Sequence, residues 1–247
     1  MPVNTNGLVI RGISISNIGY SGLLAIIKKS ILEGRQTAIA YANANSINSL
    51  YEFPELQNWL NKFDIIHPDG SGIRIAARIL NKPLTASSKF TGSDLYPLLI
   101  NEAIRNKFTF YFLGHDSGTL SRISEVNPEL IVTGTHEGYN FRDEEVLQDI
   151  NRNSADILIV GLGTPKQEQW AAANRDKINS KVILCVGEGI KVFAGSKSRG
   201  PAFLRSVGLE WLWRFLGNPV KYFRRYIIGN PLFLYRIIST KMRKLAQ

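Results

Sequence analysis

The chain has 247 residues, of which 44% are hydrophobic, a composition typical of a globular protein and not of a disordered one. Its longest apolar runs, such as 157–160 and 182–186, fall far short of the roughly 20 residues of a spanning helix, so we expect no transmembrane segment. There is no charged-then-apolar leader, and the single cysteine, Cys185, excludes an internal disulfide and a multi-cysteine zinc site. We therefore expect a cytoplasmic protein.

Strand-like and helix-like segments alternate along most of the chain. The predicted strands are 9–16, 37–43, 64–69, 108–114, 130–133, 156–163 and 181–187. The predicted helices are one that follows the first strand and ends at 34, one over 46–62, one that begins at 71, one over 94–106, one that follows 114, one over 143–153 and one that begins at 165. The runs 156–163 and 181–187 are continuously apolar, as in strands that are covered on both faces. The alternation predicts an α/β fold with a mostly parallel, Rossmann-like sheet.

The positive charge is concentrated at the end of the chain. From residue 197 onward, eleven Lys and Arg residues accompany a single acidic residue, Glu210, so this segment carries the whole net charge of +10. The same segment holds nine aromatic residues. We therefore predict an α/β domain over 1–196 and a basic, aromatic, helical appendage over 197–247.

The composition of the appendage indicates an anionic surface as its partner. Apolar and basic residues alternate at helical spacing, with Gly-Asn-Pro breaks at Gly217 and Gly229. Short amphipathic helices of this kind favour an anionic membrane surface, where aromatic residues lie at headgroup level. Two alternatives remain open: a nucleic acid bound through phosphates and stacking, or an apolar face that simply packs on the body.

Polar residues follow two of the predicted strands. Asn43 and Asn45 alternate at the end of one strand, so both can face one pocket, although Asn also caps helices. Asp69 ends the next strand and either takes a proton from a substrate hydroxyl or caps a helix. Small residues that let a ligand approach the backbone come next: Gly70, Ser71 and Gly72. In parallel sheets such loops meet at one edge, where ligands bind.

Two further predicted strands end in glycine-rich loops. The first carries a Gly-x-Gly turn and a helix start that suits an anion, with Gly161, Gly163, Pro165, Lys166, Gln167 and Glu168 as candidate binding residues. The second begins with Gly187 and Glu188. Neither loop is a dinucleotide fingerprint or a P-loop. His67, His115 and His136 have no metal-ligand spacing, so we assign no metal.

Five blocks occur in an order that resembles a known family. They are HPDGSGI (67–73), KFTGSDL (89–95), GTHEGY (134–139), GLGTPKQEQW (161–170) and GLEWLWR (208–214). Over essentially its full length the chain resembles the WecG/TagA/CpsF glycosyltransferases, which form glycosyltransferase family 26.

The resemblance implies an inverting, metal-independent enzyme of the GT-E architecture without a cofactor. Such enzymes transfer a sugar from a UDP-sugar donor to a sugar on a polyprenyl-diphosphate lipid, in the synthesis of cell-surface polysaccharides. It implies Asp69 as the catalytic base, Asn43 as a pocket residue and 161–167 as the nucleotide-sugar loop.

The resemblance also gives the appendage a role. It implies peripheral binding to the inner face of the cell membrane and arginines that complete the active site. The candidates are Arg199, Arg205, Arg214, Arg224 and Arg225, with Trp211 and Trp213 at the membrane or acceptor. Lys89 and Arg214 are the cations expected beside the departing diphosphate.

The chain departs from the family pattern at three places, which bear on the donor. Tyr41 replaces a threonine, Lys89 replaces an arginine and so loses the bidentate fork, and GEGIK brings Glu188 and Lys191 to the sugar site. These departures favour UDP-glucose as the donor. UDP-N-acetylmannosamine and its uronic acid, whose carboxylate would suit Lys191, are the alternatives.

Two other classes of protein compete with this interpretation. A nucleotide-dependent oxidoreductase requires a full dinucleotide fingerprint, which the chain lacks. A non-enzymatic module that binds anionic surfaces leaves the polar strand ends of the neutral body unexplained. We expect no nucleic acid partner, and we expect that an apolar appendage can pair with another subunit when no membrane is present.

Overall fold

The computed structural model describes residues 7–82, 84, 91–197, 200–201, 203–204 and 208–245. Its centre is a six-stranded sheet in the order β4-β3-β8-β7-β5-β6, in which all pairs are parallel. The strands are β3 (Thr37–Ala42), β4 (Ile65–Pro68), β5 (Thr109–Leu113), β6 (Ile131–His136), β7 (Ile157–Val160) and β8 (Val182–Cys185). The predicted α/β fold with a parallel sheet is confirmed.

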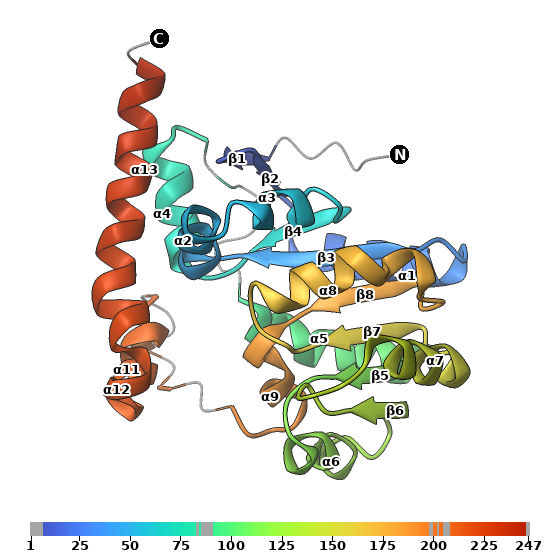
Figure 1. Ribbon diagram of the computed structural model, residues 1–247. Coiled ribbons are helices and arrows are strands. Elements are labelled where there is room, and N and C mark those ends of the chain that lie inside the picture. The colour runs from blue at the N-terminus through green and yellow to red at the C-terminus, as the bar shows by residue number, and fades with distance from the viewer. Residues whose placement is uncertain are drawn as a thin grey trace.

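Helices cover both faces of the sheet (Figure 1). On one face lie α1 (Tyr20–Leu32), α5 (Gly92–Asn106), α6 (Ser117–Val126) and α9 (Ile190–Phe193). On the other face lie α2 (Ala44–Glu52), α3 (Glu55–Leu60), α4 (Ser71–Ile79), α7 (Asp143–Asn153) and α8 (Lys166–Asn174). Short 3-10 turns, η1 (Arg175–Lys177) and η2 (Gly187–Gly189), flank β8. Alternate residues of β7 and β8 enter the cores on the two faces, so both strands are apolar throughout, as predicted.

The prediction of one strand over 9–16 is wrong. The segment forms an antiparallel hairpin of β1 (Leu8–Ile10) and β2 (Ile13–Ile15), outside the main sheet. Arg11 and Gly12 both have positive φ, at 48° and 76°. Two consecutive residues with positive φ make the tight turn that reverses a hairpin, and glycine accepts that conformation readily.

The predicted helix over 46–62 is two helices. α2 ends at Glu52 and α3 begins at Glu55, with Phe53 and Pro54 between them. Phe53 is not helical, at φ −130° and ψ 86°, because a residue before proline is disfavoured in the helical region.

The appendage is helical, as predicted. α11 (Glu210–Gly217) and α12 (Pro219–Tyr222) are separated at Asn218, whose side chain caps α12. A π-helical turn, η3 (Phe223–Ile228), then leads directly into α13 (Gly229–Leu245). The first Gly-Asn-Pro sequence therefore breaks the helix, whereas the second marks only a change from π-helical to α-helical geometry.

α13 packs against the body along α2 and α4 (Figure 1). Phe233 and Ile237 are almost fully buried in the same cluster as Ile47 and Ile73 of those helices. Each such buried side chain contributes about 1.5–3 kcal/mol. Packing on the body, one of the alternatives left open for the appendage, is thus correct for the inner face of α13.

No helix among the described residues is both long enough and apolar enough to cross a membrane.

Candidate active site

A pocket of about 320 Å³ opens at the C-terminal edge of the sheet, between the body and the appendage. One side comes from the ends of β3 and β4 and the starts of α2 and α4, and the other from α11, η3 and α13. The predicted site residues that line it are Asn43, Asn45, Asp69, Gly70, Ser71, Gly72, Trp211, Arg214 and Arg225. The pocket therefore draws on both predicted domains.

Asn43 caps α2 and also faces the pocket. Its Oδ1 accepts a hydrogen bond from the Ser46 backbone N–H at 3.0 Å, and the Ser46 hydroxyl accepts from the Asn43 N–H at 2.8 Å. This capping box commits Oδ1 to the helix, so the amide Nδ2 is turned toward Asp69, to which it donates at 3.4 Å. Both interpretations of Asn43, as a cap and as a pocket residue, are therefore compatible.

Asp69 is oriented by hydrogen bonds from two directions. Its Oδ1 accepts from the Gly92 N–H at 3.0 Å, and its Oδ2 accepts from Asn43. Gly70, which follows, has φ +84° and nothing within 4 Å of where a Cβ would stand. A half-buried carboxylate thus lines the pocket beside the open space at Gly70 and is accessible to a ligand.

Behind Asp69 the end of β4 is fixed by a buried histidine. His67 is 1% exposed, and its ring nitrogens face the Pro68 carbonyl at 2.9 Å and the Ile18 carbonyl at 3.0 Å. Burial lowers its pKa, although the two backbone contacts oppose this. His67 therefore supports the strand end.

The appendage places positive charge opposite Asp69. Arg214 on α11 forms an ion pair with Glu210 one turn earlier. Burial lowers the pKa of Arg214, but Glu210 outweighs this and raises it above its usual range, so the guanidinium stays charged. Arg225 of η3 lies with its guanidinium 5.5 Å from the centre of the Tyr226 ring. Two cations thus line the pocket that holds Asp69.

Lys197, in the segment between α9 and α11, is a candidate site residue that the sequence motifs did not predict. Burial and then the charge of Arg214 lower its pKa to about 8, while Asp69, Glu210 and Glu188 oppose this. Its electrostatic neighbours are therefore residues of the site. In the sequence it was one of many basic residues, and only the fold distinguishes it.

The predicted nucleotide-sugar loop, 161–167, is tied to the neighbouring strand end. Gln167 accepts a hydrogen bond from the Gly187 N–H at 2.8 Å and donates to Glu168 at 2.8 Å, and Thr164 donates to Glu168 at 3.0 Å. Glu168 is 1% exposed, and burial raises its pKa. Gln167 and Glu168 thus face the interior and join the two loops, and their contact with a substrate stays a prediction.

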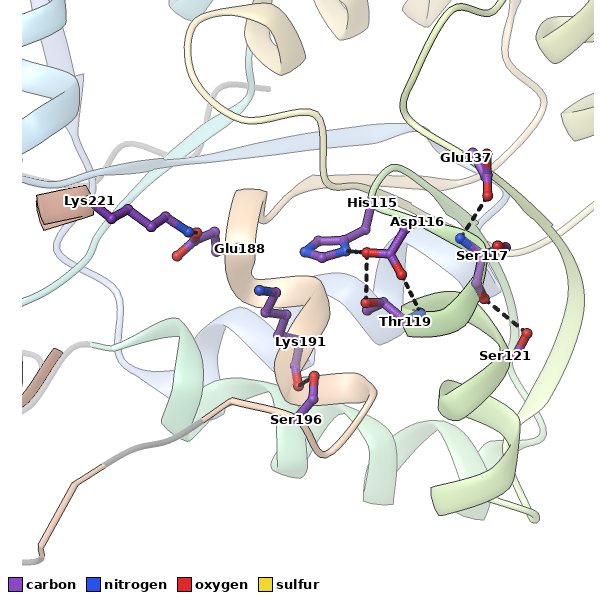
Figure 2. A network of polar contacts seen from close by, with 10 residues as sticks. All are labelled: His115, Asp116, Ser117, Thr119, Ser121, Glu137, Glu188, Lys191, Ser196 and Lys221. Carbon is purple, nitrogen blue, oxygen red and sulfur yellow. Dashed lines mark hydrogen bonds and ion pairs between the residues drawn. The ribbon is translucent and has the colours of Figure 1, made fainter. Parts of the chain in front are cut away.

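After β8, the side chain of Glu188 turns toward the appendage. Its carboxylate contacts Lys221 at 2.6 Å and accepts from the Tyr222 hydroxyl at 3.2 Å. Figure 2 shows Lys221 extending to Glu188, with Lys191 on the same short segment. Glu188 therefore contacts the appendage at the predicted sugar-binding edge, and Lys191 lies on α9, directly after η2.

His115 and Asp116 follow β5 at the same edge. His115 Nδ1 lies 2.6 Å from Asp116 Oδ2, and its ring points toward the segment of η2 and α9 (Figure 2). Asp116 also caps α6, and hydrogen bonding, first from the Thr119 N–H, lowers its pKa to about 2. In the sequence, the lack of metal-ligand spacing gave His115 no predicted role, and only the fold places it at this edge.

The remaining predicted residues lie elsewhere. Gly161, Gly163 and Pro165 belong to the loop after β7, outside the lining of this pocket. Lys166 and Arg224 are exposed, and Trp213 is 38% exposed. Lys89, Arg199 and Arg205 lie outside the described residues. Among the described residues, no three His, Cys, Asp or Glu side chains form a cluster able to hold a metal ion.

Comparison with known proteins identifies the family. The model of the glycosyl transferase WecG/TagA/CpsF family matches residues 8–247. A Bacillus spizizenii protein named N-acetylglucosaminyldiphosphoundecaprenol N-acetyl-beta-D-mannosaminyltransferase is 30% identical over 190 residues, covering 75% of this chain and 72% of its own. A Staphylococcus aureus protein of the same name is 27% identical over 227 residues, covering 86% of this chain and 88% of its own. The chain therefore belongs to the WecG/TagA/CpsF family of glycosyltransferases and is a hexosyltransferase.

Proposed function

We propose that the protein transfers N-acetylmannosamine from a UDP-sugar to a sugar carried on a polyprenyl diphosphate, at an anionic membrane surface. The names of the two relatives specify an N-acetylmannosaminyl group and an undecaprenyl-diphosphate acceptor. They give no support to glucose, the donor favoured by the sequence.

The composition of the pocket is the observation that carries this proposal. Asp69 and Asn43 lie on one side, and Arg214 and Arg225 on the other. Apolar surface completes the lining, from Ile75, Trp211, Phe233 and Leu234. Transfer from a UDP-sugar to a lipid-linked sugar needs all three: cations for the departing UDP diphosphate, apolar surface for the first prenyl units, and a base for the acceptor hydroxyl.

In the proposed reaction, Asp69 takes the proton of the acceptor hydroxyl while the oxygen of that hydroxyl attacks the anomeric carbon of the donor sugar. The bond from that carbon to the UDP oxygen breaks on the opposite face, so the configuration inverts and UDP leaves with the bonding electrons. Asn43 holds Asp69 in orientation. Because the diphosphate gains negative charge, Lys197, Arg214 and Arg225 stabilise it electrostatically.

We assign the donor to the loops after β7 and β8, which adjoin the pocket along the same edge. Gly163 has φ +79° and nothing within 4 Å of its would-be Cβ, so the backbone is open to a ligand. Lys191 and Lys197 are the nearby cations of that edge.

The outer face of the appendage supports membrane binding. Among its exposed large apolar side chains are Leu216, Val220, Phe223, Ile227, Ile228, Tyr235, Ile238 and Met242. Exposed cations accompany them, among them Arg224 and Arg243. Apolar and basic groups on one short helical segment fit the interface of an anionic bilayer, where each cation near the surface adds about 1 kcal/mol.

A UDP-release assay tests the proposal. Purified protein is given UDP-N-acetylmannosamine, UDP-glucose and UDP-N-acetylmannosaminuronate in turn, with and without a short-chain lipid-diphosphate N-acetylglucosamine acceptor. We expect acceptor-dependent release with the first donor. Release that ignores the acceptor, or a clear preference for another donor, would contradict it.

Pelleting with anionic liposomes tests the proposed membrane binding. A truncation at 196 is unsuitable because it removes Phe233 and Ile237 from the core. The variant Val220→Glu/Phe223→Glu changes only exposed side chains. We expect it to pellet less than the wild type, and equal pelleting would refute the assignment of this face.

A further inference from the structure

We infer that Glu188 is a positioning residue whose bonds to Lys221 and Tyr222 hold α11, α12 and η3 so that Arg214 and Arg225 face Asp69. We call Glu188, Lys221 and Tyr222 the clasp. The inference rests on the proposed function and gives Glu188 a different role from the substrate contact that the sequence predicted.

The clasp uses both oxygens of one carboxylate. Lys221 Nζ lies 2.6 Å from Oε1 (Figure 2). The Tyr222 hydroxyl donates to Oε2 at 3.2 Å. Glu188 is itself fixed, because the Gly187 N–H bonds to Gln167 and the Gly189 N–H bonds to the Val186 carbonyl at 2.8 Å. A rigid strand end of the body thus holds two consecutive residues of the appendage.

The two halves of the appendage are attached differently. α13 is anchored by buried apolar residues, by the Asn48 amide on the Gly229 carbonyl at 2.7 Å, and by Arg236 on Asn48 Oδ1 at 2.8 Å. By contrast, α11 and α12 contain no buried residue, and η3 contains only Tyr226. Since no packed core fixes α11 and α12, polar contacts decide where they lie.

Aromatic contacts connect the clasp to residues that line the pocket. The ring of Tyr222 stacks on Tyr226, with centroids 5.4 Å apart, and Tyr226 contacts Trp211 at 5.8 Å. Arg225 lies over the Tyr226 ring. Trp211, Tyr226 and Arg225 all line the pocket with Arg214. A shift of Tyr222 therefore displaces the cationic wall opposite Asp69.

The charges and the exposure of Glu188 and Lys221 set how much activity should be lost when their ion pair is broken. Burial raises the pKa of Glu188, but Lys221 and then Arg225 and Lys191 outweigh it and lower the pKa to about 2. The side chains of Lys221 and Glu188 are 50% and 37% exposed. An exposed ion pair is worth at most about 1 kcal/mol, equivalent to about a fivefold change in rate. It is also weakened by salt.

Charge exchange tests the inference in the full-length protein. We expect Glu188→Lys and Lys221→Glu each to lower kcat/KM for the lipid acceptor by about fivefold, and the double exchange to recover most of the loss. We expect hydrogen exchange in α11 and α12 to quicken in both single variants, to slow again in the double one, and to stay unchanged in α13. The matched control exchanges Lys28 and Glu102, an ion pair at 3.1 Å that joins α1 to α5, and leaves both readouts unchanged.

Three results would overturn the inference. Single variants with unchanged kinetics and exchange would show that the clasp positions nothing. A double exchange that stays as slow as Glu188→Lys alone would show that Glu188 contacts substrate directly. Faster exchange spread evenly over α13 and the body would show general destabilisation. Hydrogen exchange needs no substrate, so it tests the clasp even if the wild type transfers no sugar to the lipid acceptor. That absence of transfer would refute the proposed function alone.

Discussion

Replacement of Asp69 by asparagine separates its role as a base from its role in structure. Asp69 accepts from the Gly92 N–H and from Asn43 Nδ2, and Asn43 cannot reverse its amide because Oδ1 caps α2. In Asp69→Asn the amide oxygen keeps the bond to the Gly92 N–H, while the new NH₂ group faces the NH₂ group of Asn43. The structural cost is therefore one hydrogen bond, about 1 kcal/mol of unfolding free energy.

The catalytic cost should be much larger than the structural one. Loss of a general base lowers turnover by about 100- to 10,000-fold, since the neutral amide cannot take the acceptor proton. We would measure UDP release in steady state, with UDP binding and urea unfolding on the same preparations. UDP binding should be unchanged, because the donor loops follow other strands.

Asp64 provides the matched control. It stands before β4 as Asp69 stands after it, and its carboxylate bonds to the Ala38 N–H at 2.8 Å and to Arg175 at 3.0 Å. Asp64→Asn should lower stability but leave turnover per folded molecule unchanged. If Asp69→Asn retained turnover within a few-fold of Asp64→Asn, the reasoning about the base would be refuted.

Three further predictions concern the core, pH and metal removal. Phe233→Ala should lower the unfolding free energy by about 3–5 kcal/mol, whereas Tyr235→Ala on the opposite, 68% exposed side of α13 should change it little in urea unfolding; equal losses would contradict the packing. Because the pKa of Glu188 is about 2 and not its ordinary 4.5, its contribution is complete above 4.5 and is lost as the pH falls toward 2. Urea unfolding should show wild type losing stability across that range more steeply than Glu188→Gln, and identical slopes would refute it. Finally, UDP release should survive EDTA because Arg214 and Arg225 supply positive charge, and restoration of a lost activity by a divalent cation would overturn this.

Local patterns predicted the sheet and its polar edge well. The apolar runs that became β7 and β8 are buried on both faces, and Asn43 and Asp69 lie together because parallel strands end at the same edge. The hairpin at Arg11 and Gly12 was missed because eight residues of strand-like sequence look alike whether or not the chain reverses within them.

Features that depend on long-range docking were beyond sequence reasoning. The inner residue Phe233 and the outer residue Tyr235 are both aromatic, so helical periodicity cannot tell which one the body will cover. Likewise, Glu188 and Lys221 are 33 residues apart, and only the approach of α12 to the end of β8 makes them partners. Lys197 gains its low pKa from burial in the folded site and not from its sequence neighbours.

The docking of α13 has a consequence for the order of events during synthesis. Every strand of the sheet precedes α13 in the chain, so the ribosome releases the complete body before the helix that closes the core over α2 and α4. Until then the nascent body exposes an apolar face of its own, the kind of surface that chaperones hold. When α13 emerges, its docking covers that face and also adds Phe233 and Leu234 to the lining of the pocket, so the core of the body and the active site are completed in the same event.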